Sequence, residues 1–303
     1  MIATRSIPLS ALELSAAMRA ALPYDASRLD RVLRVDERHG LVEVQAGTEW
    51  KTIAAALRPG DARAAAVRTT MRTVGESVAA NTAGPDGRPA ISHVESITLV
   101  TPAGELRRVS RTANRELFAL VAGGQGLFGA LYSVTLDIGS LSRAVNEAAA
   151  EPATTGQPLL LPPDAVDAFL ADARRRCEAW RLPLQGVSVR RTHEDKDSFL
   201  RWARREYAAI TLRLAEPPVL GVAVRTTQLR RELLDAAISH GGSFPVWCVS
   251  DATRAQVEAC YPQLRAFLAE KRRVDPDEKL TNAWYRHYRG LLFGKRCEVR
   301  WAH

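Results

Sequence analysis

The stretch Arg72-Thr-Val-Gly-Glu-Ser-Val-Ala-Ala-Asn-Thr-Ala-Gly-Pro-Asp-Gly-Arg88 is built mostly from small residues. It lies between two segments whose apolar pattern predicts strands, and from Gly75 to Thr82 it carries little bulk. Glycine and alanine let another backbone or a ligand come close, because neither has a side chain that blocks the approach. We therefore expect a glycine-rich loop here, shaped either by a tight turn or by a bound molecule.

The composition is that of a folded protein with about two domains. The chain has 303 residues, of which 46% are hydrophobic and 25% charged. No apolar run reaches the roughly 18 residues that a membrane span needs. Glu13 and Arg19 interrupt the region that would form the core of a signal peptide. We therefore expect a cytoplasmic protein with no membrane contact.

Charge and single motifs exclude several classes of function. The net charge of +8 permits nucleic-acid binding, but the arginine pairs are spread over predicted helices, where solvated faces explain them. The four cysteines form no C-x-x-C, and the six histidines show no ligand spacing, so we expect no metal site. The sequence has no G-x-S-x-G, H-E-x-x-H or Walker motif, and the catalytic residues stay unknown.

Hydrophobic periodicity predicts an α+β protein. Hairpins are expected at 31–47 and 96–109, a helix after Asn114, and a strand over 130–138. A linker-like run follows. Beyond it the pattern predicts helices at 164–180, 197–207, 227–240, 251–271 and 280–288, and strands at 186–191, 208–214, 219–224 and 243–249.

The segment Gly124-Gln-Gly-Leu-Phe-Gly129 matches G-x-G-x-x-G. A dinucleotide fingerprint needs a strand before this motif and a helix after it, so that the pyrophosphate meets the helix N-terminus. Here a predicted helix comes first and a predicted strand second. We therefore expect a glycine-rich turn where the backbone approaches a neighbour.

The order of the motifs resembles that of a flavoprotein family. V-x-V-Q-A-G-x-x-W, T-V-G-x-S-V-A-A-N-x-x-G, T-P-A-G-E-L, N-R-E-L-F and G-G-x-G-x-F-G follow one another between residues 32 and 138. This set resembles the PCMH-type FAD-binding domain of the vanillyl-alcohol oxidase / p-cresol methylhydroxylase superfamily. The segments 230–244, 260–262 and 271–288 resemble the cap domain and tail of FAD-linked oxidases that act on alcohols.

The resemblance implies a domain organisation and a cofactor site. A PCMH-type FAD-binding domain would cover residues 1–140, a linker 141–163, an α+β cap or substrate domain 164–270, and a tail that returns to the FAD domain 271–303. Small residues would be needed because the flavin lies along the backbone, whose N–H groups face the pyrophosphate. The matching cofactor-binding positions are Thr73, Val74, Gly75, Ser77, Asn81, Thr82, Gly84, Gly129 and Leu131.

The chain departs from the family pattern in two places. No counterpart of the family's first glycine-rich loop, which grips the pyrophosphate, occurs before residue 32, and Pro245-Val-Trp-Cys248 replaces the polar strand expected beside the substrate. Unpaired buried phosphates are costly, so we expect FAD binding that is noncovalent and either weak or lost. Arg68, Arg72, Arg88 or a partner chain, including a second copy, would have to compensate.

Two functions follow from these observations. The first is an FAD-dependent oxidoreductase that acts on a CH–OH donor, an alcohol or a sugar-like small molecule. The second is a flavin-free relative that serves as a binding or scaffold protein. Fold similarity does not decide between them, because function depends on the site.

Overall fold

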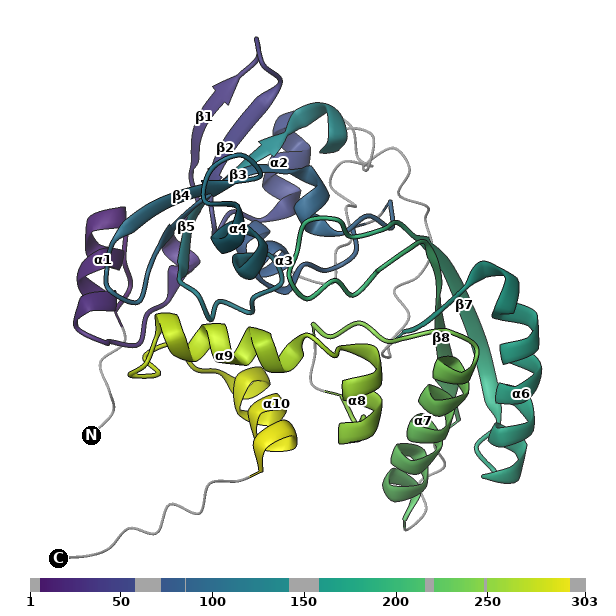
Figure 1. Cartoon of the computed structure of the whole chain (residues 1–303). Helices are drawn as coiled ribbons and strands as arrows, with labels where there is room; N and C mark the ends of the chain where they lie inside the picture. The colour runs from purple at the N-terminus through teal and green to yellow at the C-terminus, as the bar shows by residue number, and fades with distance from the viewer. Residues whose placement is uncertain are drawn as a thin grey trace, which may run out of the picture.

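The chain folds around two antiparallel sheets (Figure 1). The computed structural model describes residues 6–57, 72–84, 86–141, 158–215, 221–247 and 250–294. The strand order is β1-β2-β5-β3-β4 in the first sheet and β6-β8-β7 in the second. The strands are β1 (Val32–Asp36), β2 (Leu41–Gln45), β3 (Val94–Val100), β4 (Leu106–Ser110), β5 (Ala130–Asp137), β6 (Leu159–Leu161), β7 (Leu184–Thr192) and β8 (Tyr207–Leu214).

Helices accompany each sheet and continue into a C-terminal group (Figure 1). Those of the first half are α1 (Ala11–Arg19), α2 (Trp50–Leu57), α3 (Val74–Ala80) and α4 (Arg115–Val121). Helices α6 (Val166–Ala179) and α7 (Val222–Ser239) share a core with the second sheet. The C-terminal group is α8 (Arg254–Cys260), α9 (Leu264–Val274) and α10 (Ala283–Phe293). No helix in these described ranges is long and apolar enough to cross a membrane.

The alternating apolar residues of the first half form the expected sheet. Val42 and Val44 of β2 face Leu136 and Val134 of β5, and all four are buried. The hairpins at 31–47 and 96–109 and the strand from Ala130 are confirmed. In β2 Val42 and Val44 are buried and alternate with half-buried residues, because one face of this strand packs on the core.

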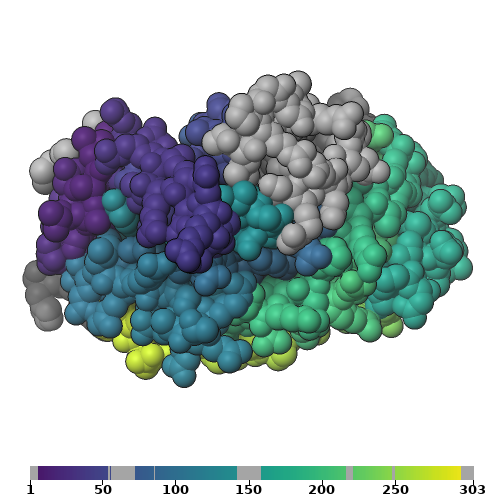
Figure 2. Space-filling view, turned by 90° about the horizontal axis from the view of Figure 1, so that it is seen from above, coloured from purple at the N-terminus to yellow at the C-terminus, as the bar shows by residue number. Residues whose placement is uncertain are grey.

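One hydrophobic core joins both domains and the C-terminal helices. Val134, Trp202 and Phe267 all belong to it. The rings of Phe128 and Phe267 meet edge to face with centroids 5.0 Å apart. Figure 2 shows the two domains next to each other, with C-terminal residues in yellow along the lower edge. The C-terminal group therefore packs against the first domain.

Several elements of the second half differ from the sequence-based expectation. Residues 197–206 form no helix, because the carboxylate of Asp195 accepts the N–H groups of Asp197 and Ser198 and holds a turn there. The helix expected over 251–271 is divided into α8 and α9 at Pro262, whose ring restricts the preceding residue and removes a backbone donor.

Three further segments also differ. Residues 222–224, expected in a strand, begin α7. Ser243 makes only an isolated bridge to Leu160, where a strand over 243–249 was expected. Strand β6 lies within the stretch that reads as a linker, and it pairs with β8. Each of these short apolar runs is compatible with more than one element, and tertiary contacts decide between them.

Candidate cofactor site

Residues Val74–Ala80 form helix α3, where the sequence predicted a loop. The side chain of Thr73 accepts the N–H of Glu76 at 3.2 Å, and the Glu76 carboxylate accepts the N–H of Thr73 at 3.1 Å. This reciprocal pair is a capping box, which satisfies two donors at a helix start. The T-x-x-E spacing was therefore a helix signal that the small residues concealed.

Each N–H group in the first turn of α3 has an acceptor within the protein. Phosphate usually binds to N–H groups at a helix start that have no acceptor within the protein. A phosphate at this position would therefore have to displace a protein acceptor. For residues 74, 75, 76 and 77 the acceptors are Thr48 O (3.0 Å), Ala46 O (2.7 Å), Thr73 Oγ1 (3.2 Å) and Thr73 O (3.1 Å).

Gly75 lies directly against the backbone of Ala46. A Cβ placed on Gly75 would lie 2.7 Å from the Ala46 carbonyl oxygen and 2.8 Å from the Ala46 Cβ. Nearby, the Ser77 hydroxyl accepts the indole N–H of Trp50 at 2.7 Å. Contacts within the protein therefore already require a glycine at position 75.

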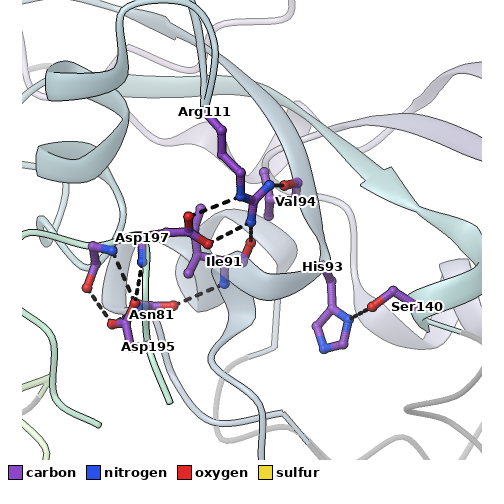
Figure 3. Close-up of polar contacts among 9 residues, drawn as sticks. Asn81, Ile91, His93, Val94, Arg111, Ser140, Asp195 and Asp197 are labelled. Carbon is purple, nitrogen blue, oxygen red and sulfur yellow. Dashed lines mark hydrogen bonds and ion pairs between the residues drawn. The ribbon is translucent and has the colours of Figure 1, made fainter. Parts of the chain in front are cut away.

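Asn81 connects the end of α3 to two distant parts of the chain (Figure 3). It adopts the left-handed conformation at φ 49°, which asparagine tolerates at a helix end. Its Oδ1 accepts the N–H of Ile91 at 3.0 Å, and its Nδ2 donates to Asp195 Oδ2 at 2.9 Å. The indole of Trp202 donates to the Asn81 carbonyl at 2.7 Å. The end of α3 is thus bonded to the loop that precedes β8.

The carboxylate of Asp195 organises that loop from a fully buried position. Besides Asn81 it accepts the hydroxyl of Ser198 and the N–H groups of Asp197 (3.2 Å) and Ser198 (3.1 Å). Burial raises the pKa of Asp195 above the ordinary carboxyl value, against the opposing effect of the hydrogen bonds from Ser198. Asp195 therefore joins the two domains as a buried acid.

A second polar contact crosses the same interface. The guanidinium of Arg111 binds both carboxylate oxygens of Asp197, with Nε–Oδ1 at 3.1 Å and Nη2–Oδ2 at 2.8 Å. Its other N–H groups donate to the carbonyls of Ile91 (2.9 Å) and Val94 (2.5 Å), as Figure 3 shows. A bidentate pair fixes orientation as well as distance. Sequence reasoning missed this pair, because its members are 86 positions apart and Asp197 was expected to begin a helix.

The remaining predicted site residues, Thr82, Gly129 and Leu131, contact other parts of the protein. Thr82 is buried, and its carbonyl accepts the N–H of Ala90 at 2.9 Å. A Cβ on Gly129 would lie 2.4 Å from a methyl group of Leu99, which also faces the buried Leu131 across the sheet. The structure gathers Thr73, Val74, Gly75, Ser77, Asn81, Thr82 and Gly84 on one segment and places Gly129 and Leu131 at the start of β5. Their contact with a cofactor stays a prediction.

Gln125 carries a buried donor beside the same segment. Its backbone N–H donates to the carbonyl of Ala79 at 2.7 Å, and its carbonyl accepts the side chain of Asn282 at 2.8 Å. Its side-chain Nε2 has no hydrogen-bond partner in the part of the chain that the structure describes. An unpaired buried donor costs about 1–3 kcal/mol. The site therefore fits a ligand that brings an acceptor oxygen to the end of α3.

We expect Gly75→Ala to lower the free energy of unfolding by about 1–3 kcal/mol, because the added methyl group meets backbone that cannot move aside. The matched control is Gly290→Ala in α10, where a Cβ meets nothing within 4 Å. That change should be neutral or stabilise by up to about 1 kcal/mol. Urea unfolding measures both, and equal effects of the two variants would contradict the assigned packing.

Asp195→Asn should change the pH dependence of stability. A folded-state pKa above the unfolded one makes the wild type lose stability as the pH rises from the ordinary carboxyl value through the raised value. Asparagine does not ionise, so the stability of the variant relative to the wild type should increase between about pH 4.5 and pH 7.5. Thermal unfolding of both proteins at both pH values measures this. If the stability of the variant relative to the wild type fell as the pH rose, the folded protein would not disfavour the anionic form of Asp195.

Comparison with known families identifies the first domain. Residues 10–110 match a family described as FAD binding domain, a range that runs from α1 to the end of β4 and includes α3. No curated protein matches the chain. Within the described ranges, no three His, Cys, Asp or Glu side chains are grouped so that they could hold a metal ion. The chain is therefore an α+β protein in which a PCMH-type FAD-binding domain, with FAD as its cofactor, is followed by an α+β cap domain.

Proposed function

We propose that the chain is an FAD-dependent oxidoreductase that holds its flavin noncovalently and oxidises a CH–OH donor, an alcohol or a sugar-like small molecule. The observation that carries this proposal is the FAD-binding match over residues 10–110, together with the Asn81–Asp195 bond between the matched domain and the cap domain. Bound FAD supplies the hydride acceptor. The protein then has to bind, orient and shield the reactants.

The residues around the end of α3 suit these tasks. The Nε2 of Gln125 is available to donate to an acceptor oxygen of the cofactor. Asp195 and Ile91 fix the Asn81 amide, so the segment is held in one conformation before a ligand arrives. The Arg111–Asp197 pair holds the cap loop, whose Trp202 is buried, against the first domain.

Noncovalent attachment is supported by the position of His39. This exposed histidine lies in the turn between β1 and β2, where its Nδ1 is 2.9 Å from Asp36 Oδ1. Hydrogen bonding with His39 contributes most to lowering the pKa of Asp36. His39 is therefore engaged with Asp36 in this turn, which supports a flavin that is not bonded to it. Denaturation should then release the flavin from the protein.

The activity is tested by mixing FAD-loaded protein anaerobically with a panel of primary alcohols, secondary alcohols and sugars. Oxidation of a CH–OH donor transfers two electrons to the flavin and bleaches its absorbance at about 450 nm. We expect bleaching with at least one member of the panel. An FAD-loaded protein that no member reduces would contradict the CH–OH donor class.

Gln125→Met tests which atoms hold the cofactor. Methionine replaces the unpaired amide by an apolar chain of similar length, so the apo protein should become more stable by about 1 kcal/mol. Loss of one hydrogen bond should at the same time weaken FAD binding about tenfold. Fluorescence titration with FAD and thermal unfolding of the apo protein measure the two effects.

Thr226→Val is the matched control for that variant. The hydroxyl of Thr226 is also buried without a hydrogen-bond partner among the described residues, but it lies on α7 in the second domain. This change should likewise stabilise the protein and leave FAD affinity unchanged. If Gln125→Met behaved in the same way, Gln125 would have no part in cofactor binding.

A flavin-free binding or scaffold protein is the second candidate. It is favoured by the acceptors that already occupy the first-turn N–H groups of α3, since these groups would otherwise meet phosphate. In the oxidoreductase, phosphate contacts come from other donors, which a second copy or a partner chain could supply. FAD affinity that rises with protein concentration would support that source.

A further inference from the structure

A histidine that follows the segment from Thr73 to Gly84 in the chain is hydrogen-bonded to a serine and faces a carboxylate. His93 ends the short 3-10 helix Ala90–His93, and its side chain is 4% exposed. Its Nδ1 lies 2.5 Å from the hydroxyl of Ser140. Its Nε2 lies 3.5 Å from Asp86 Oδ2 and makes no hydrogen bond among the described residues, so the carboxylate acts on it through charge. Figure 3 shows the pair of His93 and Ser140, apart from the Asn81 network. An imidazole between a hydroxyl and a carboxylate is the arrangement that activates a nucleophile.

The surroundings hold this arrangement in place. The Asp86 side chain is 2% exposed, and its Oδ1 accepts the N–H of Arg88 at 3.1 Å. A Cβ on Gly84 would lie 2.9 Å from Asp86 Oδ1, so glycine at this position makes room for the carboxylate. The N–H of Ser140 donates to Asp137 Oδ1 at 2.5 Å, which fixes the backbone of the serine.

The charges favour the tautomer that can take a proton from Ser140. Burial alone would raise the pKa of Asp86, but the neighbouring imidazole of His93, together with Arg88, holds this pKa below the ordinary value. The anionic carboxylate favours the hydrogen on the facing Nε2 of His93, which leaves Nδ1 free to accept. The guanidinium of Arg88, 3.5 Å from the same oxygen, shares this carboxylate.

We propose that Ser140, His93 and Asp86 form an activated-serine site that accepts the acyl group of a carboxylic ester. Ser140 is half-exposed, whereas its two partners are buried. Its Oγ bonds to the acyl carbon while its proton passes to Nδ1 of His93. The ester C–O bond then breaks, and the alcohol leaves with that proton. Water releases the carboxylic acid by the same steps, so no oxidant or cofactor takes part.

The site is independent of flavin and has a direct chemical test. The full chain is treated with diisopropyl fluorophosphate, and the modified serine is located by mass spectrometry of its peptides. We expect Ser140 to react at least tenfold faster than any other serine. A hydroxyl that serves only as a hydrogen-bond partner would be no more reactive than the rest, and that result would overturn the proposal.

Variants test the role of the histidine. Since a general base contributes at least about 100-fold, His93→Gln should slow the labelling of Ser140 by about that factor. Ser110→Ala removes a half-buried hydroxyl that accepts the N–H groups of Thr112 and Ala113 in another turn, and it should leave the rate at Ser140 unchanged. Labelling of Ser140 that persists in folded His93→Gln would contradict activation by His93. Should this variant fail to fold, the rate for Ser140 in the wild type decides the question.

Discussion

The buried carboxylate of Asp195 is the contact on which the arrangement of the two domains depends. It takes hydrogen bonds from Asn81 of the first domain and from Ser198 of its own loop, so one group fixes the end of α3 and the path of the chain toward β8. A buried acid that accepts several hydrogen bonds is specific, because removing any partner leaves a polar group unsatisfied. The part-buried Arg111–Asp197 pair then orients the same loop.

Contacts within the protein explain the small residues of the segment that runs from Thr73 to Gly84. Gly75 is required by Ala46, and the first-turn N–H groups already have protein acceptors. The segment is therefore a tightly packed helix whose free hydrogen-bonding capacity lies near its C-terminal end, at Gln125. A cofactor held there would touch the domain interface, where the cap domain can respond to it.

Much of the first domain could be predicted from the sequence, because the alternating valines of β2 and the Val134–Leu136 alternation of β5 place apolar side chains on a shared buried face. The second half was less predictable. The turn at Asp197 depends on a carboxylate whose partner Asn81 is 114 positions away, and no local pattern contains that information. Helix α3 is a different case. Its T-x-x-E cap was present in the sequence, but the glycine and alanine content pointed to a loop.

The same limit applies to the site. The motif order identified the segment that carries Thr73 to Gly84, and the FAD-binding match covers it. It could not show that Gln125 is left with an unpaired donor or that Arg111 reaches Asp197, since both depend on side chains brought together by folding.

The most direct test of this account is the visible absorption spectrum of the purified chain after incubation with FAD and desalting. We expect flavin to stay with the protein and to give the two bands of oxidised flavin at about 370 and 450 nm. A folded protein that stays colourless would contradict it and would leave the flavin-free scaffold as the function of this fold.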